Sequence, residues 1–221
     1  MLISYKALSK PGEATVIEKK SRFIAFARPI STEGDAEAFL AELRKKYWDA
    51  SHHVYAYILQ DCAGGAARRR QSDDGEPSGS AGAPILEVLA GAGLVNVIVV
   101  VIRYFGGTLL GVGGLLRTYS AAAKAAILEA GTIEMKLCRE YSLELSYPAW
   151  NRVKNMTKGY HAASVVYGER ITVQFLVEVA MVPAFEALIT DATGGLSSAG
   201  AKLVILGEGF YSTLRIQSYN K

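Results

Sequence analysis

The stretch VNVIVVVIRYFGGTLLGVGG, residues 95–114, determines the fold of the first part of this chain. The apolar run from Val95 to Ile102 predicts a central strand that is covered on both faces of a sheet. Arg103-Tyr104-Phe105 and a glycine-rich turn, GGTLLGVGG at 106–114, follow that strand. An Ala-rich helix is expected from Leu115 to Ala130, because Gly131 provides the glycine that commonly ends a helix.

Upstream of this stretch, the sequence predicts three strands and two helices. Strands are expected at 14–20, 22–30 and 52–59, where β-branched and aromatic residues are concentrated. Thr32 caps a helix through Tyr47 in which apolar residues recur every three or four positions. Residues 61–84 contain almost no large apolar side chains, so we expect a long loop, and Pro84 opens a short helix that reaches Ala90.

A second set of elements begins near Lys136. Strands are expected at 141–146, 161–167, 171–179 and 202–206, and helices at 148–158 and 183–190. The order strand–helix–strand–strand–helix–strand is that of a ferredoxin-like unit. The sequence therefore predicts an α+β protein with two domains, 1–135 and 136–221.

The composition excludes several classes of protein. The net charge of +3 is too small for a chain that binds nucleic acid through bulk charge, so such contacts need a local basic patch. The longest apolar run has nine residues, far below the roughly 20 that cross a bilayer. Cys62 and Cys138 lack metal-like spacing, and two reduced thiols fit a cytoplasmic protein.

The glycine-rich turn is the main candidate binding site, because backbone N–H groups in such a turn, and at a helix start, can hold an anion. Known phosphate motifs do not fit it: Val112 replaces the lysine of a Walker loop, and Leu116 replaces the small residue of a dinucleotide fingerprint. Tight packing of the turn is the alternative interpretation. The candidate binding residues here are Arg103, Tyr104, Phe105, Gly106, Gly107, Gly111, Gly113, Gly114 and Arg117.

The polar segment ahead of Pro84 is the second candidate. Asp73, Asp74 and Glu76 could act with His52 in acid–base chemistry, although such clusters are also ordinary turn chemistry. His52 and His53 point to opposite faces of a strand, so we expect one to join the acidic loop and the other to lie on the surface. Further binding candidates are Ser78, Ser80, Arg68, Arg69 and Arg70, the arginines being expected in a flexible loop.

Four segments together resemble the signature of the IMPACT/YigZ family: KSRFIAFA (20–27), DASHHVYAY (49–57), SDDGEPSGSAGAPILEVL (72–89) and NVIVVVIRYFGGTLLGVGGLLRTYSAAAKAAI (96–127). The resemblance implies a ribosomal-protein-S5-domain-2-like α/β fold for the first domain and a ferredoxin-like second domain, similar to the C-terminal domain of translocating elongation factors. It also implies a cytoplasmic protein linked to translation.

From the residues and this resemblance we expect a regulator of translation. It would bind RNA, the ribosome or a translation-regulating protein through the basic, glycine-rich site. One alternative is a hydrolase that uses Asp73, Asp74, Glu76 and His52 on a phosphorylated or peptide-like small molecule. A pure protein-interaction module is the other. No nucleophile arrangement is recognisable, and we expect neither a cofactor nor a metal.

Overall fold

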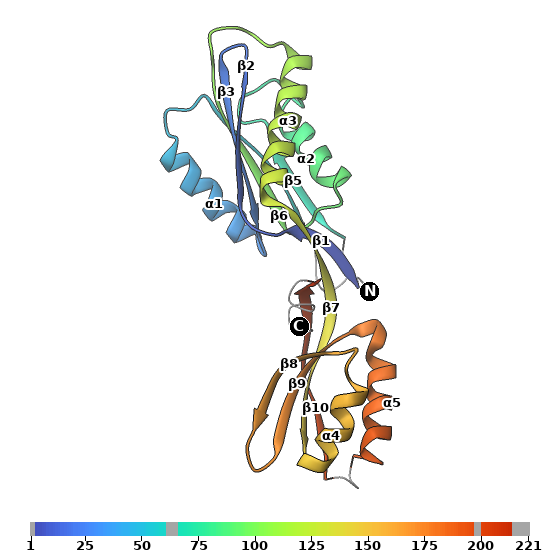
Figure 1. The fold of residues 1–221 in the computed structure, drawn as a ribbon. Coiled ribbons are helices and arrows are strands. Elements are labelled where there is room, and N and C mark those ends of the chain that lie inside the picture. Colours follow the sequence, from blue (N-terminus) through green and yellow to red (C-terminus); the bar gives the residue numbers. More distant parts are fainter. Residues whose placement is uncertain (1–2, 61–65, 197–199, 214–221) are drawn as a thin grey trace. The chain divides into compact units, whose positions relative to one another are not determined.

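The computed structural model describes residues 3–60, 66–196 and 200–213, so Cys62 and the start of the expected loop lie outside the described residues. The chain divides into two compact units, Met1–Ile133 and Glu134–Lys221, which are described separately (Figure 1). No helix among the described residues is both long and apolar enough to cross a membrane.

The first unit is built on a five-stranded antiparallel sheet in the order β2-β3-β6-β4-β5. The strands are β2 (Gly12–Glu18), β3 (Ser21–Pro29), β4 (His52–Leu59), β5 (Arg68–Ser72) and β6 (Val97–Tyr104). In β6, the central strand, every residue from Val97 to Arg103 is buried. The predicted central strand is thereby confirmed, and its last buried residue is an arginine.

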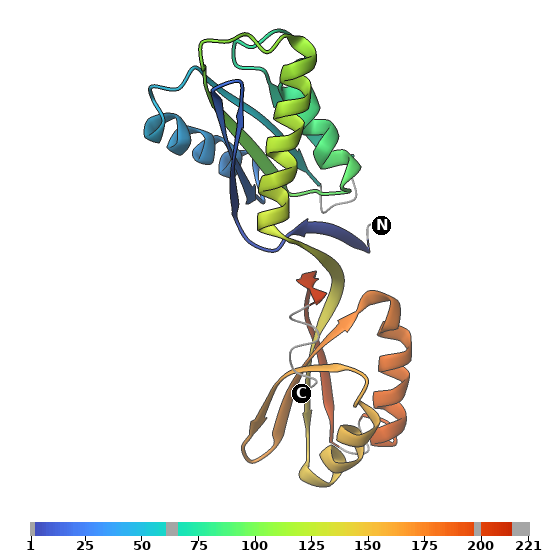
Figure 2. The ribbon, with the colours of Figure 1, turned by 45° about the horizontal axis from the view of Figure 1, so that its top comes forward.

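Helices cover both faces of this sheet, as Figure 2 shows. Helix α1 (Glu33–Lys46) packs on the side of β6 that carries Ile98, Val100 and Ile102. Helices α2 (Gly82–Gly91) and α3 (Val112–Ala130) pack on the side that carries the alternate residues, starting with Val97. Because successive strand residues point to opposite faces, one strand supplies two hydrophobic cores.

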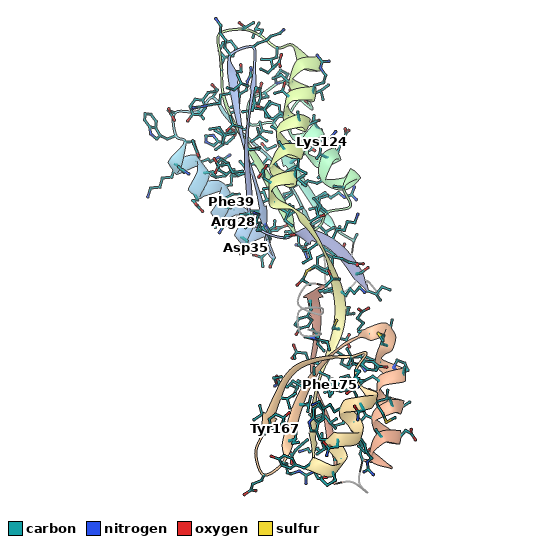
Figure 3. All side chains as sticks on the ribbon, viewed as in Figure 1. Arg28, Asp35, Phe39, Lys124, Tyr167 and Phe175 are labelled. Carbon is teal, nitrogen blue, oxygen red and sulfur yellow. The ribbon has the colours of Figure 1, made fainter. Side chains whose placement is uncertain are left out.

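Helix α1 begins at the predicted cap. The Asp35 N–H donates to Thr32 Oγ1 at 3.1 Å, and the Asp35 carboxylate accepts the Thr32 N–H at 2.8 Å. Phe39 faces the sheet, where the guanidinium of Arg28 lies 4.8 Å from the centre of its ring (Figure 3). The two hydrogen bonds between Thr32 and Asp35 form a capping box, which fixes where α1 starts.

Several elements differ from the prediction. Strand β1 (Ser4–Leu8) was not expected, and β5 lies within the segment that was predicted to be a loop. Arg68, Arg69 and Arg70 therefore lie on a strand and not in a flexible loop. The sequence RRRQS of β5 shows no alternation of apolar and polar residues, because this edge strand is mostly exposed. It forms a strand through its pairing with β4. Helix α3 starts at Val112, inside the glycine-rich stretch.

The second unit has the ferredoxin-like element order that was predicted. It contains β7 (Thr132–Leu145) from Glu134 onward, α4 (Tyr147–Met156), β8 (His161–Tyr167), β9 (Ile171–Glu178), a short 3-10 helix (Val179–Met181), α5 (Val182–Thr193) and β10 (Lys202–Ser212). Its four strands pair antiparallel in the order β8-β9-β7-β10. Tyr141, Phe175 and Phe185 lie at the centre of its core.

The capping box gives the first testable prediction. Thr32→Ala removes the oxygen that accepts the Asp35 N–H, so the free energy of unfolding should fall by about 1 kcal/mol. Thr32→Ser keeps that oxygen and serves as the matched control in urea unfolding. Equal stability of the two variants would contradict the assigned role of Thr32.

Candidate functional site

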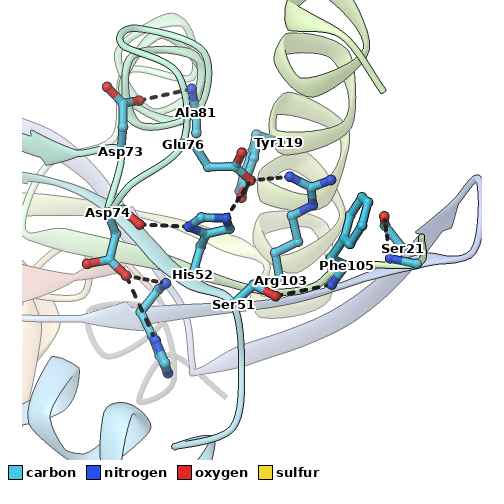
Figure 4. A network of polar contacts seen from close by, with 12 residues as sticks. Ser21, Ser51, His52, Asp73, Asp74, Glu76, Ala81, Arg103, Phe105 and Tyr119 are labelled. Atoms are coloured by element: carbon cyan, nitrogen blue, oxygen red, sulfur yellow. Dashed lines mark hydrogen bonds and ion pairs between the residues drawn. The ribbon is translucent and has the colours of Figure 1, made fainter. Parts of the chain in front are cut away.

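A buried carboxylate joins three elements at one end of the first unit's sheet (Figure 4). Arg103, on β6, donates through Nη1 to Glu76 Oε1 at 2.6 Å, and the Tyr119 hydroxyl of α3 donates to the same oxygen at 2.6 Å. Glu76 lies in the segment between β5 and α2, and the side chains of Arg103 and Glu76 are only 6% and 3% exposed. Burial, followed by the bond to Glu76, raises the pKa of Tyr119 far above its ordinary value, so its hydroxyl stays a donor.

Aromatic rings complete the enclosure of Arg103. Its guanidinium carbon lies 5.4 Å from the ring centre of Phe23 and 5.6 Å from that of Phe105, within the range of cation–π contacts. The residue is 5% exposed in total. Nη1 donates to Glu76, and the buried Nε has no hydrogen-bond partner in the described part of the chain.

The two histidines of β4 both lie beside the acidic loop. His52 Nδ1 is 2.8 Å from the Asp74 carbonyl oxygen, which can only accept, so Nδ1 carries the hydrogen. His52 Nε2 then faces Glu76 Oε1 at 3.9 Å. His53 is buried, and its burial lowers its pKa despite the nearby Asp74 carboxylate. The expectation that one of the pair would lie on the surface was therefore wrong for His53.

The Asp74 side chain contributes to local structure. Its Oδ2 accepts the His53 N–H at 2.6 Å, and its Oδ1 accepts from Arg44 at 3.3 Å. Among the described residues, no three His, Cys, Asp or Glu side chains are grouped to hold a metal ion.

Asp73 occupies the N-terminal end of α2 with its own carboxylate. It accepts the N–H groups of Gly79, Ala81 and Gly82 at 2.8, 3.0 and 2.8 Å. Burial alone would raise the pKa of Asp73, but these three donors outweigh it and hold the pKa below its usual value. The place where a helix start could bind an external anion is thus filled by a residue of the protein itself.

The glycine-rich turn rests on the neighbouring hairpin. A Cβ added to Gly106 would lie 2.1 Å from the backbone carbon of Lys20, so only glycine allows this approach. Gly106 N–H donates to Ser21 Oγ at 3.1 Å, and Phe105 N–H donates to Ser51 Oγ at 3.3 Å. Gly107 and Gly111 have φ of +82° and +71°, while Gly113 and Gly114 belong to α3.

An exposed surface surrounds this turn, and we call it the turn surface. Its apolar members are 49% (Phe105), 82% (Leu109), 55% (Val112) and 37% (Leu116) exposed. Its basic members are exposed as well: Lys19, Lys20, Arg22 and Arg117. Sequence reasoning found Phe105 and Arg117 but missed the others, although the Lys19-Lys20 pair between two predicted strands was a usable signal.

Of the remaining predicted residues, the three arginines of β5 lie apart from the turn. Arg70 is paired with Tyr57 of β4, and Arg103 is paired with His52 of the same strand. Because Tyr57 and His52 are about 17 Å apart at the usual rise of a strand, Arg70 and Arg103 are separated by a similar distance. Nη1 of Arg68 lies 3.7 Å from Oε1 of Glu33, a residue at the start of α1. Ser80 is buried with its hydroxyl unpartnered in the described part of the chain, and Ser78 is exposed. Tyr104 donates to Asp49 at 2.8 Å and lies under Arg22.

Comparisons with known proteins agree with the fold of both units. The sequence profile of the Impact N-terminal domain matches residues 19–127, and that of a domain of unknown function, DUF1949, matches residues 143–196. The IMPACT family member YvyE of Bacillus subtilis is 34% identical over 199 residues, covering 89% of this chain and 90% of that protein. YigZ of Escherichia coli is 39% identical over 138 residues, covering 60% and 66% respectively.

A solved structure is similar to this chain over both units. A crystal structure described as that of a hypothetical protein superposes with a TM-score of 0.60 at 28% identity. The alignment covers 94% of this chain and 99% of that one, so the similarity includes both units.

The buried carboxylate gives a second prediction. Glu76→Gln leaves the buried Arg103 without its counter-charge, which should lower the free energy of unfolding by about 3–5 kcal/mol. Tyr119→Phe removes one hydrogen bond to a charged group and should cost about 1.5–3 kcal/mol. Tyr104→Phe, at a more exposed tyrosine–carboxylate bond, is the control and should cost about 0.5 kcal/mol or less. Urea unfolding measures all three, and an unchanged Glu76→Gln stability would refute the network.

A third prediction concerns the pH dependence of Asp73. Because its folded-state pKa is depressed, its contribution is fully present above the unfolded-state pKa of about 3.9 and is lost as the pH falls through the lower folded-state value. The stability difference between the wild type and Asp73→Asn should therefore be largest near neutral pH and shrink in acid. A difference that stays constant between pH 7 and pH 2.5 would count against the three N–H bonds.

Proposed function

The chain belongs to the IMPACT family, and from this membership and the geometry we propose that it is a translation-associated binding protein whose contact surface is the turn surface. The family resemblance implies the link to translation. The observation that supports this surface is the gathering of four exposed cations, Lys19, Lys20, Arg22 and Arg117, around a turn fixed by close backbone packing.

RNA, free or in the ribosome, is the ligand class that fits the charge of this surface. Cations at such positions neutralise phosphates without reading sequence, and an exposed aromatic ring offers a stacking face for an unpaired base. Phe105 is the half-exposed ring of the turn surface, and Arg117 lies one helical turn into α3. In this proposal Arg103 does not touch phosphate but supports Phe105 from below.

The hydrolase alternative receives little support from the geometry. Asp73 is held by three N–H groups, Asp74 by His53 and Arg44, and Glu76 by Arg103 and Tyr119. Each carboxylate thus already has a structural role within the first unit. A second candidate, a protein contact, is favoured by one observation: Leu109 and Val112 are mostly exposed at the tip of the same surface.

Charge reversal tests the RNA proposal. We expect single-stranded RNA to bind with an affinity that falls linearly with salt on logarithmic axes. Reversing Lys19 and Lys20 together to Glu should weaken RNA binding at least tenfold in low salt. It should also reduce the slope of log affinity against log salt concentration by about 1.4, because each lost phosphate contact of a single strand contributes about 0.7. Reversing Arg152 and Lys154, two exposed cations of α4, is the matched control and should leave binding unchanged.

Two outcomes would overturn or redirect the proposal. Equal RNA affinity of the two double variants would refute a role for the turn surface in RNA binding. If Leu109→Ser abolishes co-sedimentation with ribosomes while the Lys19/Lys20 reversal has no effect, the contact is a protein surface, which is the second candidate.

A further inference from the structure

A groove runs between α2 and α3 of the first unit, at the opposite half of α3 from the turn surface. Its volume is about 680 Å³, and all its lining residues belong to this unit. We propose that this groove binds one amphipathic α-helix of a partner protein. The inference does not depend on the proposed RNA contact, because the two surfaces share no residue.

The lining residues follow helical spacing on both walls. On α2, Pro84, Val88 and Gly91-Ala92 recur every three or four residues, and on α3 so do Ser120, Lys124 and Leu128. Each helix thus presents a single ridge to the groove. Each ridge, over residues 84–92 and 120–128, is about 12 Å long at 1.5 Å per residue, enough for about two turns of a third helix. Figure 3 labels Lys124 on this side of α3.

Small residues keep the groove open. A Cβ added to Gly91 would meet no atom within 4 Å, so the space above that position is empty. Ala92 and Ser120 extend the shallow floor, while Leu128 is 80% exposed at the rim. An exposed leucine beside an open floor is what an apolar ridge from a partner would cover.

The bound segment must make hydrogen bonds with its own backbone N–H and C=O groups, because the groove offers few partners for them. Both walls are helices, whose N–H and C=O groups bond within each helix, and among the lining residues only Thr132, the first residue of β7, belongs to a strand. An extended peptide would find no ladder of partners here, whereas a helix brings all its backbone bonds with it. Its apolar side chains at i, i+4 and i+7 span about 10 Å, which matches the length of the walls.

Charge selects the orientation and composition of that helix. Glu87 lies on the α2 wall and Lys124 on the α3 wall, and both are exposed. Neither makes a hydrogen bond or ion pair within the described ranges, so both are available to a partner. The complementary helix carries basic residues along the flank that faces Glu87 and acidic residues along the flank that faces Lys124.

The probe is a fluorescein-labelled, lactam-stapled 14-residue helix (~20 Å at 1.5 Å per residue) with leucines at i, i+3, i+4 and i+7, lysines along one flank and glutamates along the other. Fluorescence anisotropy should show saturable binding, with a dissociation constant on the order of micromolar. Replacing the leucines by serine should abolish it. Methyl NMR shifts should fall on Val88, Ile127 and Leu128 and not on Leu109.

Gly91→Leu adds a side chain where a Cβ meets no atom within 4 Å, so it should weaken peptide binding at least tenfold while the unfolding midpoint stays unchanged. Gly159→Leu is the matched control, since Gly159 also faces open space but lies in the second unit. The double variant Glu87→Lys with Lys124→Glu provides an independent test, because exchanging both wall charges should reverse the preference between the probe and a charge-swapped peptide. RNA affinity should remain unchanged in Gly91→Leu.

Several results would overturn this inference. They are equal peptide affinity of Gly91→Leu and the wild type, no saturable binding of either peptide, or NMR shifts confined to the turn surface. Concentration-dependent dimerisation that Gly91→Leu abolishes would identify a second copy of this chain as the occupant in place of a partner helix.

Discussion

The carboxylate of Glu76 is the interaction on which the rest of the first unit depends. A buried negative charge is costly unless it is paired and hydrogen-bonded, and here one oxygen accepts from both Arg103 and Tyr119. These partners come from the central strand and the longest helix of the unit, while Glu76 comes from the segment before α2. The same ion pair holds Arg103 under Phe105, so it also supports the glycine-rich turn. The buried contacts among Glu76, Arg103 and Tyr119 therefore position the turn, and they leave little of the Arg103 charge exposed to solvent.

The acidic loop as a whole uses its charges internally. Asp73 caps α2, Asp74 holds the two histidines, and Glu76 holds Arg103. Other residues of the segments that resemble the family signature are exposed, among them Lys20, Leu109 and Arg117. The signature thus contains both buried supporting residues and exposed surface residues.

Much of the fold could be predicted from local patterns. The run Val97–Ile102, the Thr32 cap and the spacing of Phe39 and Leu43 all specify elements through residues close in sequence. Strand β5 could not be predicted, because its arginines form a strand only by pairing with β4. The partnership of Glu76 and Arg103 was equally hidden, since 27 residues separate them and neither spacing nor composition links them. The sequence showed an arginine after an apolar run, but not that a carboxylate would neutralise it.

The position of β6 has a consequence for how firmly the turn is held. Its amides pair with β3 on one side and β4 on the other, and both of its faces are buried. Such a strand opens only when the whole unit unfolds, so its amides are the last to exchange their hydrogens with solvent. The glycine-rich turn leaves directly from this slowest-exchanging element. A ligand that docks on it meets a surface already close to its bound shape, and little conformational entropy is lost on binding.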